Sequence, residues 1–140
     1  MCSSDLAYCG SGVMAASFYI ADASPATAGT NVAVSSASGA PALILPAGAV
    51  VISVSITTET GSGTFDLGAT GYTSGTADNN YIASGLTVAV GTTSVGSVVT
   101  GAALTEMSYV TVTDNTSASG AVTGFITYFV ADPLFGQQNV

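Results

Sequence analysis

Eight carboxylates are the only side chains that carry a full charge at neutral pH in this 140-residue sequence, which has no lysine, arginine or histidine. They are Asp5, Asp22, Glu59, Asp66, Asp78, Glu106, Asp114 and Asp132. A pair of carboxylates can hydrolyse a glycosidic bond, so one interpretation is a carbohydrate-active module that uses Asp66 or Asp78. The eight residues are spread singly along the chain, however, and no tryptophan is present to stack against a sugar. Serine or cysteine catalysis requires a base, usually histidine or lysine. We therefore predict that the protein is not an enzyme and has no catalytic residues.

Carboxylate and amide oxygens in loops are also the ligands that calcium prefers. The candidates are Asp66, Asp78 with Asn79 and Asn80, and Asp114 with Asn115. No D-x-D-x-D-G loop contains them, and Asp and Asn initiate turns on their own account. We therefore favour turn formation and predict no bound metal.

Two further patterns are weak signals for a cofactor or a zinc site. The segment GSGVMA (residues 10–15) fits G-x-G-x-x-A, but the strand before it and the acidic residue about twenty positions after it are missing. Cys2 and Cys9 are the only cysteines. Either a disulfide that closes this short loop or two reduced thiols fits the spacing, and without histidine a zinc site is not indicated. We predict no cofactor.

The net charge of −8 restricts the partners. Nucleic-acid and anionic-membrane binding depend on lysine and arginine, so neither is expected. Copies of the chain repel one another, and assembly must use apolar and backbone contacts or a partner that carries positive charge.

The elements that position these residues are predicted to be strands of one domain. Val and Thr favour strands, and 17 glycines supply turns. The clearest strand follows Pro46 and Gly48. Its alternation predicts one face with Val50, Ile52, Val54 and Ile56, and an opposite face with Ser53, Ser55 and Thr57.

The rest of the chain continues the same pattern. GSGTFDLGATG (residues 61–71) is expected to form the hairpin partner of that strand, and residues 72–80 a polar loop. Residues 81–90 should place Leu86, Val88 and Val90 on one face. The most apolar segment, residues 121–132, is expected to be a central strand or one covered by a neighbouring subunit. About eight short strands with frequent turns predict a β-sandwich or jelly roll without long helices. We divide the chain into an N-terminal arm with the first strand (1–24), a sandwich core (25–132) and a C-terminal tail (133–140).

Aromatic and apolar residues gather toward the two ends of the chain. We assign Phe125 and Phe129 to the core. Side chains near the termini can instead pack against another subunit. The predicted partner or oligomer interface contains Tyr8, Phe18, Tyr19, Tyr128, Leu134 and Phe135.

Three segments resemble tailed-phage virion proteins of the β-sandwich head decoration (cement) type. They are LPAGAVVISVSITTETGSGTFDLG, ADNNYIASGLTVAVGTT and YVTVTDNTSASGAVTGFITYFVADP, within residues 41–133. The resemblance implies a structural protein on the outer surface of a bacteriophage capsid. It also implies binding to the major capsid protein and to copies of itself, with a homotrimer favoured. The alternatives are a tail or fibre component of a virion and a subunit of a microbial surface filament.

Overall fold

Short alternating segments separated by glycine turns form nine strands in the computed structural model, which describes residues 12–23, 32–91, 93–98 and 101–131. These ranges contain no helix, so none that is long and apolar enough to span a membrane. The strands are β1 (Met14–Ile20), β2 (Val32–Ala33), β3 (Ile44–Leu45), β4 (Ala49–Thr58), β5 (Ser62–Gly71), β6 (Ala77–Thr87), β7 (Thr93–Val98), β8 (Ser108–Ser119) and β9 (Val122–Val130). The all-β prediction is confirmed, with one strand more than expected.

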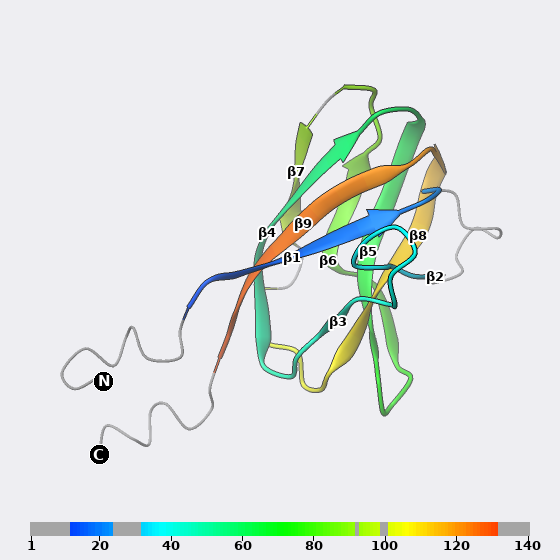
Figure 1. Cartoon of the computed structure of the whole chain (residues 1–140). Helices are drawn as coiled ribbons and strands as arrows, with labels where there is room; N and C mark the ends of the chain where they lie inside the picture. The colour runs from blue at the N-terminus through cyan, green and yellow to red at the C-terminus, as the bar shows by residue number, and fades with distance from the viewer. Residues whose placement is uncertain (1–11, 24–31, 92, 99–100, 132–140) are drawn as a thin grey trace, which may run out of the picture.

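The strands form two antiparallel layers that face each other (Figure 1). The first sheet, sheet A, has the order β1-β9-β4-β7. The second, sheet B, has the order β7-β6-β5-β8, and the short strands β2 and β3 both pair with β8. β7 belongs to both sheets, because its first residues pair with β4 and its last two with β6. The predicted β-sandwich is therefore the observed architecture, joined along one side by a shared strand.

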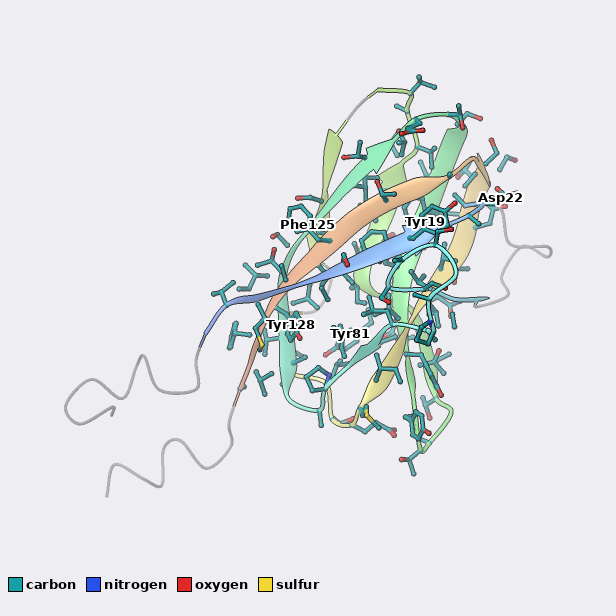
Figure 2. All side chains as sticks on the ribbon, viewed as in Figure 1. Tyr19, Asp22, Tyr81, Phe125 and Tyr128 are labelled. Carbon is teal, nitrogen blue, oxygen red and sulfur yellow. The ribbon has the colours of Figure 1, made fainter. Side chains whose placement is uncertain are left out.

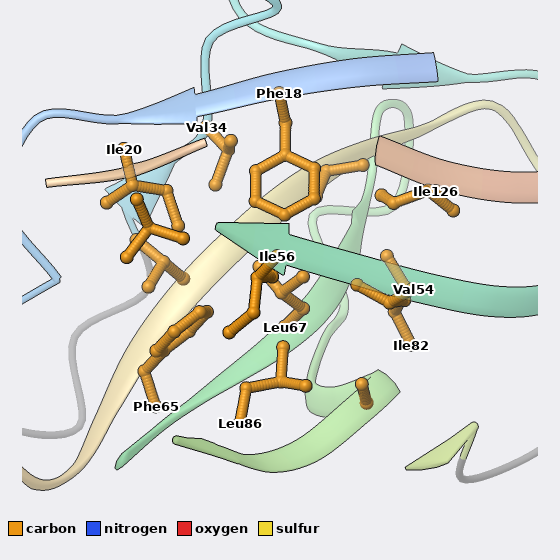
Figure 3. Packing of buried hydrophobic residues seen from close by; sticks show 14 of the residues in the cluster. Phe18, Ile20, Val34, Val54, Ile56, Phe65, Leu67, Ile82, Leu86 and Ile126 are labelled. Atoms are coloured by element: carbon orange, nitrogen blue, oxygen red, sulfur yellow. The ribbon is translucent and has the colours of Figure 1, made fainter. Parts of the chain in front are cut away.

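The core lies between the two sheets and is almost entirely aliphatic and aromatic (Figure 3). β1, β4 and β9 contribute from sheet A, and β5, β6 and β8 from sheet B. The largest fully buried side chains include Phe18, Phe65, Leu45, Ile56, Leu67, Ile82, Leu86 and Ile126. Each such side chain stabilises the fold by about 1.5–3 kcal/mol on burial. β1 is thus an integral strand of sheet A, while residues 1–11 of the predicted arm and the predicted tail (133–140) lie outside the described residues.

A β-bulge in β4 changes which residues face the core. The register with β9 shifts between Val51 and Ser53, which leaves Ile52 as an extra residue. Val51 and Val54 are both buried, whereas Ile52 is 45 % exposed. The predicted apolar face is therefore correct for Val54 and Ile56 but wrong for Ile52 and for Val50, which lies on the face opposite the buried Val51.

The sequence predicted that β5 is the hairpin partner of β4, and this prediction is wrong. β4 pairs with β7 and β9, whereas β5 pairs with β6 and β8 in the other sheet. The β4–β5 and β8–β9 connections cross between the sheets at glycines with positive φ, Gly61 (129°) and Gly120 (97°). The two connections touch, since a Cβ on Gly120 would lie 2.0 Å from the carbonyl oxygen of Thr60. Only glycine fits this approach, and it directs each chain segment out of one sheet into the other.

Two smaller predictions about β6 are also wrong. The polar loop is shorter than expected, because β6 begins at Ala77 and contains Asp78, Asn79 and Asn80 as exposed strand residues. Leu86 and Val88 are buried as predicted, but Val90 lies in a turn and is exposed. Residues 122–130 do form a central strand, since β9 lies between β1 and β4.

Candidate interaction surfaces

The carboxylates considered for catalysis or calcium lie mainly on sheet B and hold the backbone in place. One oxygen of Asp66, Oδ1, accepts hydrogen bonds from Ser84 Oγ (3.1 Å), the Gly85 N–H (2.7 Å) and Asn115 Nδ2 (3.1 Å). These donors come from β6 and β8, on either side of β5. Asp66 therefore ties three strands together.

The other two calcium candidates bind their own local backbone. Asp78 Oδ1 accepts the Asn80 N–H at 3.3 Å, and Asp114 Oδ1 accepts the Ala118 N–H at 2.9 Å. Of the calcium candidates, Asp66 and Asn115 are joined by a hydrogen bond. Among the described residues, no group of three or more Asp, Glu, His or Cys side chains is arranged to hold a metal ion.

Glu106, which no sequence motif singled out, organises the turn between β5 and β6. Its Oε2 accepts the N–H groups of Thr73 (2.8 Å) and Ser74 (3.2 Å). Hydrogen bonds from the Ser74 side chain and the Thr73 backbone lower the pKa of the Glu106 carboxyl below its ordinary value. A negative charge is thus held in a fixed place at this end of the sandwich.

Beside this carboxylate lies an exposed apolar surface on the outside of sheet B, which we call the tyrosine patch. It consists of Ile44, Tyr72, Met107 and Tyr109. Ile44 is the cross-strand neighbour of Tyr109, whose ring lies 5.3 Å from that of Tyr72. The Tyr72 N–H donates to the Met107 carbonyl at 2.8 Å. Tyr72 is 52 % exposed, and Met107 and Ile44 are also exposed.

A groove of about 530 Å³ lies at the same end of the sandwich as the tyrosine patch, although none of the four patch residues lines it. Gly71 and Glu106, the chain neighbours of Tyr72 and Met107, are among its lining residues. Asp78 and Tyr81 also line it, and the Tyr81 hydroxyl donates to the carbonyl oxygen of Ala102. The groove therefore combines two carboxylates with a tyrosine at the margin of an apolar surface.

The outside of sheet A has a different character, because β1, β4, β7 and β9 contain no charged residue. We call the outward side of β1, β9 and β4 the sheet A face. At its centre Phe125 is 47 % exposed and stands on the outside of β9 (Figure 2). Its cross-strand neighbours are Ser17 on β1 and Ser55 on β4. A large ring is thus flanked by two small hydroxyl side chains.

The residues predicted as an interface are not brought together on one described surface. Phe18 is 2 % exposed and belongs to the core, so its assignment to an interface is wrong. Tyr19 and Tyr128 are half-buried, and Tyr128 packs against the core (Figure 2). Tyr8, Leu134 and Phe135 lie outside the described residues.

The exposure of Phe125 corrects its assignment to the core, and Phe129 on the same face of β9 is half-buried and is not part of the core either. Ile126 is fully buried, and neighbouring residues of a strand point to opposite faces. The sequence alone does not show which face is the core, because β9 has large apolar side chains on both faces. The sequence does not predict the tyrosine patch, because Ile44 and Tyr72 are distant in the chain from Met107 and Tyr109.

Of the comparisons with known proteins, the one with solved structures found similar chains. No protein-family model matches the sequence, and no curated protein matches it significantly. A chain in "Capsid of Ralstonia phage GP4" is similar in structure, with a TM-score of 0.58 and 15 % identity over 89 % of this chain and 88 % of that chain. A chain in "Cyanophage Pam1 capsid asymmetric unit" has a TM-score of 0.51 and 16 % identity over 88 % of each. At these identities the similarity establishes a shared β-sandwich fold.

Proposed function

We propose that this chain is a non-enzymatic structural protein of a bacteriophage virion. In this proposal it decorates the outer surface of the capsid, binds the major capsid protein and associates with its own copies, with a trimer as the expected oligomer. The fold shared with chains from two phage capsids supports this function. The described carboxylates support it as well, since Asp66 and Glu106 hold strands and turns in place.

The observation that carries the proposal is the tyrosine patch with its neighbouring acidic groove. Tyrosine and methionine are enriched in protein interfaces, and exposed apolar groups of this kind are typical binding sites. Asp78 and Glu106 in the groove call for lysine or arginine on the partner. A copy of this chain has neither residue, so the partner must be a different protein. In a virion we assign that role to a basic segment of the major capsid protein.

The experiment measures binding of purified variants to capsids that lack this protein. Asp78→Lys reverses the charge in the groove, and we expect affinity to fall about tenfold or more. Tyr72→Ala removes the most exposed ring of the patch, and we expect a similar loss. Glu59→Lys is the matched control, because it makes the same charge change in the exposed turn after β4. It should bind within about twofold of wild type, as distant surface charges do.

The copy number in purified virions tests the location. Hundreds of copies per particle would support a capsid decoration protein. A few dozen copies would instead support a tail or fibre component, and absence from the particle would contradict a virion function. Unchanged binding of both Asp78→Lys and Tyr72→Ala would contradict the assignment of the patch and groove to the capsid contact.

A further inference from the structure

We propose that the sheet A face is the surface through which copies of this chain bind one another. The proposed function includes self-association, and this inference identifies where it takes place. It is tested on purified protein without capsids, so its outcome is separate from that of the capsid-binding experiment.

The charge distribution indicates a second copy as the occupant of this face. Two copies with a net charge of −8 and no cationic side chain repel each other and cannot form an ion pair between side chains. The described acidic residues lie on β5, β6 and β8 or in connections, and the strands of sheet A carry none. Asp22 and Glu59 follow β1 and β4, which run in the same direction beside β9. Both charges therefore lie beyond the same end of the sheet A face.

The arrangement of large and small side chains on the sheet A face fits a contact between two copies of the chain. The row at its centre is Ser17, Phe125 and Ser55. One row consists of Tyr19, Thr123 and Thr57, and another of Ala15, Thr127 and Ser53. The small side chains around Phe125 leave space for a ring from a second copy, as in the interlocking of two packed sheets. The hydroxyl groups keep the face soluble in the monomer and can hydrogen-bond without charge.

The bulge in β4 enlarges the apolar part of this face. It turns Ile52 outward, near the pair formed by Val50 and Phe129. An inward Ile52 would have stabilised the core, as Val54 and Ile56 do. The exposed position is explained if a second copy covers it, because large exposed apolar groups mark interaction sites.

The test is the oligomeric state of three single variants, measured by sedimentation velocity and native mass spectrometry. Phe125→Glu places a charge at the centre of the face and should weaken self-association about 30-fold or more. Ser17→Asp places a charge beside Phe125 and should act in the same direction, and it also removes the hydrogen bond that Ser17 Oγ donates to the Ser36 carbonyl at 3.2 Å. Tyr72→Glu is the matched control, because Tyr72 is as exposed as Phe125 (52 % against 47 %) but lies in the tyrosine patch. It should leave self-association within about twofold of wild type.

Salt and folding controls sharpen the result. Circular dichroism and the melting temperature of the dissociated variants must show a folded monomer. If Phe125→Glu does not fold, Ser17→Asp takes its place as the variant that tests self-association. Higher salt should maintain or strengthen the wild-type oligomer, since screening reduces repulsion and no ion pair is lost. A wild type that is monomeric at every concentration would overturn the proposal. So would an oligomer that survives both sheet A variants, or a face whose variants lose capsid binding while self-association persists.

Discussion

Asp66 offers the sharpest test of whether the carboxylates of sheet B are structural or bind calcium. Its Oδ1 accepts three hydrogen bonds, from Ser84 Oγ, the Gly85 N–H and Asn115 Nδ2, at 2.7–3.1 Å. The donors belong to strands on both sides of β5. Replacing Asp66 by alanine removes the acceptor that these strands share.

The expected cost follows from the number and exposure of these hydrogen bonds. A hydrogen bond contributes about 0.5–1.5 kcal/mol net, and one to a charged group about 1.5–3 kcal/mol. Ser84, Gly85 and Asn115 are exposed, so water replaces the lost acceptor and the lower figure applies to each donor. We therefore expect Asp66→Ala to lower the free energy of unfolding by about 2 kcal/mol. Asp66→Asn keeps a neutral acceptor and should cost about half as much.

The assay is urea unfolding of wild type and variants, with calcium and with a chelator. A structural Asp66 predicts the same loss in both conditions and no effect of the chelator on wild type. Asp78→Ala is the control, since Asp78 accepts one local hydrogen bond at 3.3 Å and should change stability by less than about 0.5 kcal/mol. The reasoning is refuted if the chelator destabilises wild type but not Asp66→Ala, or if Asp66→Ala is as stable as wild type.

Two further variants test other parts of the account. Phe18→Ala should lower the free energy of unfolding by about 3–5 kcal/mol, because the ring is fully buried; a variant with wild-type stability and weakened assembly would restore Phe18 to an interface. Glu106→Gln tests the lowered pKa of Glu106. Because the folded state favours the ionised carboxylate, Glu106 stabilises the fold at pH values above the pKa of an unfolded glutamate, which is about 4.3. Wild type should exceed Glu106→Gln in stability near neutral pH, and the difference should vanish as pH falls through the lowered pKa. A constant difference between pH about 7 and about 2.5 would contradict it.

The fold class could be predicted from the sequence, but the pairing of the strands could not. Alternation and glycine turns are local properties, so they predicted a β-sandwich and the inward positions of Val54 and Ile56. The bulge at Ile52 depends on the register with β9, about 75 residues away in the chain. The crossovers at Gly61 and Gly120 depend on how the two sheets face each other. Neither has a signature in a single segment.

The difference between local patterns and long-range pairing also explains which residues of the candidate surfaces could be predicted. Alternation shows that Phe125 and Ile126 lie on opposite faces of β9, but both are large and apolar, so the sequence does not show which of them is inside. The tyrosine patch required the pairing of β5 and β3 with β8, which brings Tyr72 and Ile44 to Tyr109. Phe18 was misassigned since position near a terminus outweighed its alternation with the buried Ile20.

The absence of cations gives the two proposed surfaces opposite responses to ionic strength. Contact between a basic capsid segment and the groove with Asp78 and Glu106 weakens as salt screens the opposite charges. Contact between two sheet A faces involves no charged strand residue, and salt reduces the residual repulsion between the copies. High salt should therefore release the protein from capsids as an intact oligomer. Low salt has the opposite effect, because it strengthens binding to a basic capsid surface and weakens self-association in solution. Under those conditions the capsid itself would bring the copies together, and a dense layer of an acidic protein could form only where a basic partner neutralises it.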